Sequence, residues 1–223
     1  MKNPWEAIRL DTYEAHMSLD SVRQLQALNA LMRDQLEAYP VRTAMILGVA
    51  GGNGLEHVRR EKYDAVYGVD LNREYLHAAA ARFPELDGVL RLLELDLTRE
   101  ADKLPRAELV IADLLVEYIG YEAFQRVLRQ VAPLYVSCVI QINDDAREWV
   151  SDSPWLHAFD GLAAVHHQME PAALTGKMTE LGYRTIAQTA APLPNGKQLL
   201  RLDFGAPVDN GYTPGYNFIN KML

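Results

Sequence analysis

Residues 48–54 form the segment whose residue types most clearly point to chemistry. Glycine lacks a Cβ atom, so its backbone can take positive φ angles and a bulky ligand can lie against bare N–H groups at a helix N-terminus. An apolar run precedes this turn, and a helix is predicted near residues 53–61. The pattern predicts a ligand site at the carboxyl edge of an α/β sheet, formed by Gly48, Val49, Ala50, Gly51, Gly52, Asn53 and Gly54.

Two phosphate-binding motifs fit this turn poorly. The dinucleotide fingerprint needs a third glycine where the chain has His57, and a P-loop needs Lys followed by Ser or Thr where the chain has Leu55 and Glu56. A glutamate at that place repels phosphate groups. The spacing therefore argues against a pyrophosphate ligand and weakens the alternative of an NAD(P)-dependent oxidoreductase.

Three consecutive predicted strands each deliver an aspartate to the same edge of the sheet. These residues are Asp70, Asp96 and Asp113. A carboxylate at the tip of the second strand can accept two hydrogen bonds from ribose hydroxyls, so Asp70 suggests a nucleoside. A single aspartate is common as a helix cap or turn former, but three of them beside a glycine turn indicate a binding site.

With these residues the chain resembles the class I S-adenosylmethionine-dependent methyltransferases over roughly residues 42–205. The family usually has an acid where this chain has Gly48 and a glycine where it has Ala50. The resemblance implies that S-adenosyl-L-methionine binds along the glycine turn. It further implies that Asp70 and Leu71 hold the ribose, that Asp96 and Leu97 hold the adenine, and that Asp113, Leu114 and Leu115 lie between cofactor and substrate.

The reaction that this resemblance implies is transfer of a methyl group to an oxygen, nitrogen or carbon nucleophile of a small molecule, with S-adenosyl-L-homocysteine as the second product. Such chemistry asks the protein mainly for alignment and desolvation, and for proton removal where the nucleophile is a hydroxyl. A non-catalytic regulatory module that binds a nucleoside is the alternative, and the departures at Gly48 and Ala50 make it conceivable.

Two regions could form the substrate side, the segment up to about residue 40 and residues 144–170. Tyr13, His16 and Met17 could cover the cofactor, and His16 is the first candidate base because imidazole titrates nearest neutrality. The alternative is a helix that docks its apolar residues into the core and leaves His16 exposed. Tyr118 is the second catalytic candidate, and it could equally be an aromatic packed at a helix start.

Further substrate-side candidates are Gln141 and Asn143, which share one face of a predicted strand, and His157. His157, His166, His167 and Glu170 have no recognised metal-ligand spacing, so no metal is predicted.

The elements that must position these residues alternate between strand and helix. The predicted strands lie near residues 43–49, 64–70, 89–95, 107–113 and 134–143, and the predicted helices near 18–38, with Ser18 as its cap, and near 53–61, 72–83, 121–131 and 171–181. Pro194-Asn195-Gly196-Lys197 predicts a final hairpin.

The predicted fold is therefore α/β, with a Rossmann-like doubly wound sheet that is mostly parallel and has an antiparallel C-terminal hairpin strand. We expect one domain: an N-terminal helical cap at 1–40, a core at 42–205 that holds the insertion 144–170, and a tail at 206–223.

Composition narrows the choice of partners and of compartment. Lys and Arg total 22 against 30 Asp and Glu, so the net charge is −8, and no basic stripe is present that would attract a phosphate backbone. We expect no nucleic-acid partner. The N-terminus lacks the apolar region of a signal peptide, so we expect a cytoplasmic protein without a membrane partner, either a monomer or a homodimer. The single cysteine, Cys138, lies in an apolar run and is expected in the core.

Overall fold

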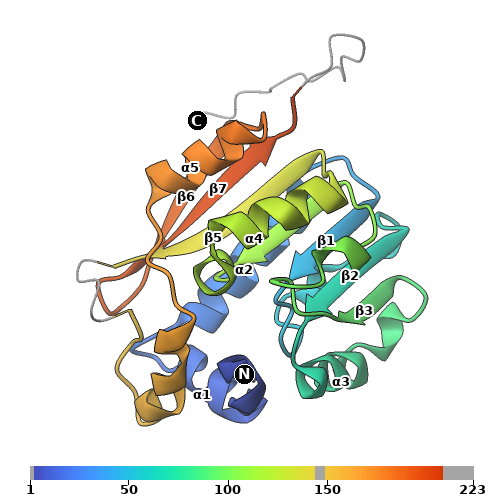
Figure 1. Ribbon diagram of the computed structural model, residues 1–223. Coiled ribbons are helices and arrows are strands. Elements are labelled where there is room, and N and C mark those ends of the chain that lie inside the picture. The colour runs from blue at the N-terminus through green and yellow to red at the C-terminus, as the bar shows by residue number, and fades with distance from the viewer. Residues whose placement is uncertain (1–2, 144–148, 208–223) are drawn as a thin grey trace, which may run out of the picture.

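The computed structural model describes residues 3–143 and 149–207, and within them seven strands form one sheet of order β3-β2-β1-β4-β5-β7-β6 (Figure 1). The first five strands pair in parallel, and β7 runs antiparallel to both β5 and β6. The bounds are β1 Thr43–Leu47, β2 Ala65–Asp70, β3 Leu90–Glu94, β4 Leu109–Asp113, β5 Tyr135–Ile142, β6 Arg184–Pro192 and β7 Gln198–Gly205. The predicted fold class and the C-terminal hairpin are confirmed.

Helices cover both faces of this sheet. Helices α2 (Gln24–Ala38) and α3 (Arg73–Arg82) pack on one face, and α4 (Val116–Val131) and α5 (Pro171–Glu180) pack on the other. In Figure 1, α4 lies in front of the strands and α2 behind them. Along β1 the side chains alternate, so Met45 and Leu47 join the core under α4 while Ala44 and Ile46 join the core under α2. Burial on both faces explains the continuous apolar run of this strand.

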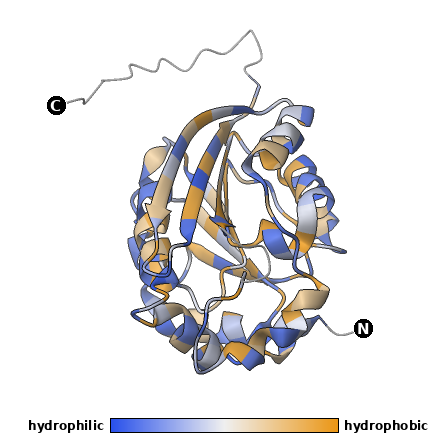
Figure 2. Cartoon of the chain, turned by 90° about the vertical axis from the view of Figure 1, so that its left-hand side faces the viewer, coloured by the Kyte–Doolittle hydropathy of each residue, from blue (hydrophilic) through white to orange (hydrophobic). Residues whose placement is uncertain are grey.

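A cap lies at the carboxyl edge of the parallel strands. It consists of the 3₁₀ helices η1 (Pro4–Ala7) and η6 (Leu156–Ala164) with helix α1 (Leu10–Ser18). Ile8, Phe159 and Leu162 form its small apolar core. Figure 2 shows hydrophobic and hydrophilic residues alternating along the helices that flank the strands, as expected for elements with one buried face.

The prediction of a helix at residues 53–61, directly after the glycine turn, is wrong. Only the short 3₁₀ helix η2 (Leu55–His57) forms there, because α2 already covers this face of the sheet. A Cβ atom added to Gly54 would lie 2.5 Å from Cγ of Met32, and the Tyr63 hydroxyl donates to the Leu36 carbonyl at 2.6 Å. A short segment that has no room to pack gains too little free energy to offset the cost of nucleating a helix. The turn therefore has no regular α-helix N-terminus behind it.

The predicted start of the N-terminal helix at residues 18–38 is also wrong. Helix α1 ends at Ser18, and α2 begins only at Gln24 after Arg23, whose φ of 50° is left-handed. The Ser18 hydroxyl donates back to the Ala15 carbonyl at 3.3 Å and caps nothing downstream. This break lets α1 turn away from the sheet and join the cap.

The other elements follow the predictions with small changes. The remaining helices are η3 (Pro84–Leu86) and η4 (Ala101–Lys103). Helix α4 starts earlier than the predicted 121–131, but Gly120, at φ 73° and ψ 165°, separates its first turn from the regular part. The hairpin forms, but its connection is Leu193–Lys197 and not a two-residue turn; Gly196 has a φ of 84° and donates its N–H to the Leu193 carbonyl at 3.2 Å. Most of the predicted tail 206–223 lies outside the described residues. None of the described helices is long and apolar enough to cross a membrane.

Candidate functional site

Two neighbouring cavities open at the carboxyl edge of the sheet. The first, here called the sheet-edge cavity, encloses about 710 Å³ including its open mouth, a size typical of ligand sites. It brings together nine of the fourteen residues predicted to bind a cofactor: Gly48, Ala50, Asp70, Leu71, Asp96, Leu97, Asp113, Leu114 and Leu115.

The glycine turn and the tip of β2 are joined by backbone hydrogen bonds to one carboxylate. The Ala50 N–H donates to Oδ2 of Asp70 at 3.0 Å, and the Asn72 N–H donates to Oδ1 at 2.8 Å. Burial raises the pKa of Asp70. Each carboxylate oxygen has a second lone pair, so the anchored group can still accept hydrogen bonds from a ligand.

Five predicted residues of the turn do not line this cavity: Val49, Gly51, Gly52, Asn53 and Gly54. A Cβ atom at Gly51 would lie 2.7 Å from a carboxylate oxygen of Glu14, and one at Gly52 would lie 2.8 Å from the Phe83 ring. The Asn53 amide donates to the Leu25 carbonyl at 3.0 Å. These glycines therefore allow helices to pack closely on the outer side of the turn, whereas Gly48 and Ala50 line the cavity.

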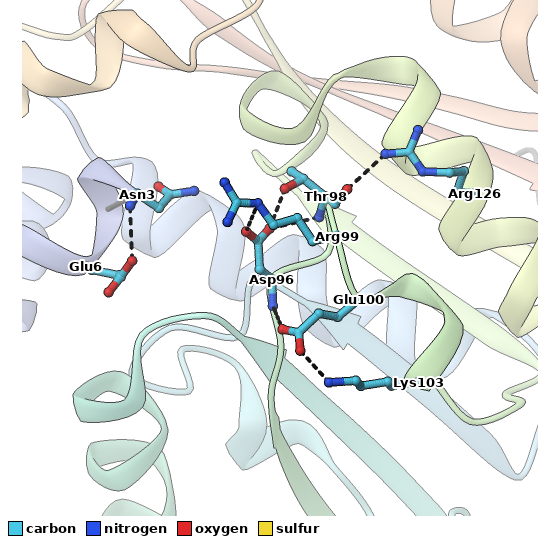
Figure 3. Close-up of polar contacts among 8 residues, drawn as sticks. All are labelled: Asn3, Glu6, Asp96, Thr98, Arg99, Glu100, Lys103 and Arg126. Carbon is cyan, nitrogen blue, oxygen red and sulfur yellow. Dashed lines mark hydrogen bonds and ion pairs between the residues drawn. The ribbon is translucent and has the colours of Figure 1, made fainter. Parts of the chain in front are cut away.

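Asp96 lines the sheet-edge cavity and stabilises the turn that follows it through hydrogen bonds (Figure 3). Its Oδ1 accepts hydrogen bonds from the N–H and the hydroxyl of Thr98 at 2.9 and 2.6 Å, and its N–H donates to Glu100 at 3.0 Å. The side chain of Asn3, from the N-terminal segment, points across toward this turn in Figure 3 and lines the same cavity. The lining residues that sequence reasoning missed here include Asn3, Thr98 and Tyr75.

Asp113 presents a buried carboxylate to the sheet-edge cavity. Oδ1 accepts a hydrogen bond of 2.8 Å from Gln35 on α2, whereas Oδ2 is buried and has no partner among the described residues. Burial raises the pKa of Asp113 to about 7, against the lowering effects of Gln35 and Arg201. The next residue, Leu114, has a positive φ of 51°, which strains a side chain other than glycine and turns the chain into the cavity wall.

The second cavity, here called the aromatic cavity, encloses about 650 Å³ including its mouth. Four residues line both cavities, namely Trp5, Tyr13, Leu114 and Tyr118, so the two spaces meet at one shared wall. Every predicted substrate-side residue except His157 lines the aromatic cavity; these are Tyr13, Met17, Tyr118, Gln141 and Asn143, and the candidate base His16 lines it too.

His16 is buried at 4% exposure, so the alternative that leaves it exposed is wrong. Its Nδ1 lies 2.8 Å from the Ser153 hydroxyl, and its ring lies 4.6 Å from that of Phe159. Burial lowers the pKa of His16 to about 4, and the charge of Lys197 adds to this. The imidazole is therefore neutral at physiological pH and a weaker base than the sequence suggests.

Tyr118 lies in the shared wall of the two cavities and also packs as an aromatic residue at the start of α4. Its position therefore agrees with both sequence interpretations, a place in the pocket and a packing role. Its ring meets Trp5 edge-on at 4.8 Å. Burial raises its pKa well above the usual value, so the phenol keeps its proton. Gln141 is engaged by its neighbours: its amide donates to Asn143 at 2.5 Å and to the Trp149 carbonyl at 2.7 Å, and it accepts a hydrogen bond from Gln24.

The expectation for His157 is wrong, because its exposed side chain pairs with Asp160 at 3.2 Å and lines neither cavity. His166 takes part in the wall instead, stacked on Trp149 with ring centroids 4.0 Å apart. Within residues 3–143 and 149–207, no group of three His, Cys, Asp or Glu side chains could hold a metal ion.

Sequence reasoning missed Glu117, which lies in the aromatic cavity at 5% exposure. Its Oε1 accepts a hydrogen bond from the Gln141 N–H at 2.9 Å, and its Oε2 is buried without a partner in the described chain. Burial raises the pKa of Glu117 to about 7. Its residue type alone gave no signal, because a glutamate in the first turn of a helix is most often exposed.

The comparisons with known proteins support the fold. No family model and no curated protein matches the chain. Among solved structures, the N-methyltransferase NodS from Bradyrhizobium japonicum WM9, in complex with S-adenosyl-L-homocysteine, is 12% identical with a TM-score of 0.64, over 93% of this chain and 100% of that one.

Two further solved structures have the same architecture. The magnesium protoporphyrin IX methyltransferase ChlM from Synechocystis PCC 6803, with bound S-adenosylmethionine, is 10% identical with a TM-score of 0.61, over 92% of this chain and 98% of that one. The [4+2]-cyclase SpnF is 11% identical with a TM-score of 0.63, over 84% and 83%. The chain thus shares the Rossmann-like fold of S-adenosylmethionine-dependent methyltransferases, as its sequence resemblance implied.

Proposed function

We propose that this protein is an S-adenosylmethionine-dependent methyltransferase that transfers a methyl group to an oxygen, nitrogen or carbon atom of a small-molecule acceptor. The observation that carries the proposal is the shared wall between two cavities at the carboxyl edge of the sheet, where α/β folds bind ligands. One cavity has the residues suited to an adenosyl group, and the other is an aromatic and polar chamber suited to an acceptor.

The sheet-edge cavity fits the cofactor in its size and in its polar groups. Asp70 would accept hydrogen bonds from the ribose hydroxyls, and the turn at Asp96 and Leu97 would border the adenine. Gly48 lets Leu115 approach the turn closely in the cavity wall, because a Cβ atom there would lie 3.0 Å from Cδ1 of Leu115. When bound, S-adenosylmethionine supplies an electrophilic methyl group, and its sulfur receives the electron pair of the broken C–S bond.

Asp113 would take over the role of the acid that related methyltransferases carry at the position of Gly48. In the parallel pairing Leu47 lies opposite Ala112, so Gly48 and Asp113 are the next residues along two adjacent strands. The free Oδ2 of Asp113 would bind the ammonium group of the methionine part. The carboxylate is thus displaced by one strand rather than lost.

The protein's own share of the reaction is to position the acceptor and to exclude water. Trp5, Tyr13, Leu114 and Tyr118 in the shared wall would set the approach of the acceptor atom. For a hydroxyl acceptor, His16 remains the proposed base because its imidazole is neutral. NodS is named an N-methyltransferase and ChlM a magnesium protoporphyrin IX methyltransferase, so these neighbours support the cofactor and leave the acceptor to this chain's own cavity.

Ligand binding and product formation test this proposal together. In calorimetry S-adenosylmethionine and S-adenosyl-L-homocysteine should bind with one site per chain and raise the melting temperature, whereas NAD should do neither. A screen of small acceptors with methyl-labelled S-adenosylmethionine should then yield a labelled product. Binding without any labelled product would favour the regulatory module, and stabilisation by NAD alone would favour the oxidoreductase.

A further inference from the structure

Glu117 is the one carboxylate among the described residues that line the aromatic cavity. It comes from the first turn of α4, which Gly120 separates from the rest of the helix. One of its oxygens accepts the Gln141 N–H, while the other is buried and has no hydrogen-bond partner in the described ranges. A buried carboxylate oxygen without a donor is costly, so a ligand that brings a donor gains binding free energy there.

No lysine or arginine lines this cavity within the described ranges. Burial lowers the pKa of His16 to about 4 and also lowers that of His166, so both imidazoles are neutral near pH 7. The ammonium group of Lys197 donates to the Trp149 carbonyl at 3.0 Å, and this lysine is not part of the wall.

Among the described residues that line the cavity, the other titratable groups leave Glu117 as the one that is ionised near pH 7. Burial raises the pKa of both Tyr13 and Tyr118, so these phenols stay neutral. Asp113 belongs to the sheet-edge cavity, and its charge acts on Glu117 by raising its pKa. The described wall of the cavity consequently carries no positively charged side chain near pH 7.

Aromatic rings line the same cavity as this carboxylate. Trp5 meets Tyr118 edge-on at 4.8 Å, and Trp149 lies 6.4 Å from Tyr118 and stacks on His166. The π faces of tryptophan and tyrosine attract cations, more strongly when water is excluded. Electron-rich rings around a lone carboxylate match an organic cation, whereas a carboxylate or phosphate on the acceptor would be repelled.

We infer that the methyl acceptor is an amine, which enters as its ammonium ion, binds the free oxygen of Glu117, and gives a proton to that oxygen. In this step an N–H bond breaks, an O–H bond forms, and the electron pair stays on nitrogen as the lone pair that methylation consumes. A positive ammonium ion and a negative carboxylate become a neutral amine and a neutral carboxylic acid, so charge balances. This inference rests on the proposed function, since it names the acceptor class of the same site.

Binding of matched probes to the complex with S-adenosyl-L-homocysteine tests the inference, because no reaction can occur there. The probes are 2-phenylethylamine, 2-phenylethanol and phenylacetate, which share a ring and differ in the polar group. Calorimetry should show the amine binding at least about tenfold more tightly than the other two, a difference of about 1.4 kcal/mol. The variant Glu117→Gln should lose this preference.

The matched control is Glu122→Gln, which removes the same charge from the exposed side of the same helix. It should keep the amine preference. Both variants should bind S-adenosylmethionine as the unaltered protein does, which verifies that they fold and separates this test from the proposed function. If the unaltered protein failed to bind S-adenosylmethionine, the proposed function would fall, and the amine inference with it.

Proton release supplies a second readout that a purely structural role for Glu117 would not produce. At about pH 6, where Glu117 is mostly protonated, binding of the ammonium ion should release a proton, so the heat of binding should depend on the ionisation enthalpy of the buffer. Glu117→Gln should abolish this dependence. An alcohol or carboxylate probe that binds as well as the amine, an amine preference that persists in Glu117→Gln, or no buffer dependence would each overturn the inference.

Discussion

Gln35 donates a hydrogen bond of 2.8 Å from Nε2 to Oδ1 of Asp113, and so fixes which oxygen of that carboxylate remains for a ligand. The same amide lies 3.0 Å from the Ser137 hydroxyl, which in turn donates to Asp203 at 2.5 Å. Arg201 pairs with Asp203 at 2.5 Å. A buried chain of polar groups on α2, β5 and β7 therefore holds the Asp113 side chain at the cavity.

Asp113→Asn should weaken binding of S-adenosylmethionine by roughly 1.5–3 kcal/mol, the typical contribution of a hydrogen bond to a charged group. The amide keeps its oxygen for Gln35 and turns its NH₂ toward the ligand ammonium. Binding of 5′-methylthioadenosine, which has no amino-acid part, should change little. Calorimetry with both ligands measures the difference.

The control for this prediction is Asp102→Asn, an exposed aspartate in η4, which should affect neither ligand. Equal weakening of both ligands by Asp113→Asn would contradict a contact with the methionine part and would mean that Asp113 only shapes the cavity.

Asp70→Ala should weaken binding of S-adenosylmethionine by roughly 1–3 kcal/mol, because the acceptors for the ribose hydroxyls are lost and the Ala50 and Asn72 N–H groups lose their anchor. Asp64→Ala is the matched control: Asp64 precedes β2 and forms an exposed ion pair with Arg42. Its loss should leave affinity unchanged. Should Asp70→Ala bind as tightly as the unaltered protein, the assignment of the ribose site is wrong.

Ala50→Gly should stabilise the protein by about 1 kcal/mol, since Ala50 has a φ of 47° and only glycine takes this region without steric cost. Ala132→Gly offers a comparison, because Ala132 has a φ of 48° at the C-cap of α4, far from the turn. Urea unfolding of the apo protein should show a similar gain for both. A loss of stability in Ala50→Gly alone would mean that its methyl group packs usefully.

The stability of the apo protein should depend on Glu117 and on pH. Burial raises the pKa of Glu117 from 4.5 to about 7, so between these values the folded state holds a proton that the unfolded state lacks. The unfolding free energy therefore falls as pH rises, by up to about 1.4 kcal/mol per pH unit. His16 acts in the opposite direction, because its pKa falls from 6.5 to about 4.

Comparison with Glu117→Gln isolates the carboxyl group, since His16 contributes equally to both proteins. The advantage of the unaltered protein over Glu117→Gln should shrink between about pH 5 and about pH 8 in urea titrations. Parallel stability curves across this range would show that Glu117 titrates at its ordinary value.

Residues in regular elements were the most predictable from sequence, because the continuous apolar run of β1 and the Asn195-Gly196 turn are local signals. The strand-tip aspartates Asp70 and Asp113 could be placed at one cavity because parallel strands end at one edge. The roles of Gly52 and Gly54 could not be assigned from sequence, because a glycine that makes room for a ligand and one that makes room for a neighbouring helix are the same residue type in the same kind of turn. Their helix neighbours, such as Met32, are distant in the chain.

Glu117 and Trp149 illustrate a second limit, because their place in the aromatic cavity depends on tertiary packing. The direction of Glu117 follows from the interruption of α4 at Gly120, and Trp149 reaches the wall through its stacking on His166. A shifted pKa cannot be predicted from sequence either. Burial of His16, which contacts Phe159 and Ser153, lowers its pKa and removes the basicity that its residue type suggests.

The position of α2 in place of a helix between β1 and β2 makes the first forty residues inseparable from the sheet. The same stretch continues through α1, where Glu14 is bound to Arg82 of α3 beside Gly51, and into η1, where Trp5 borders both cavities. Trimming the N-terminal segment would therefore uncover hydrophobic core and dismantle the binding chambers at once.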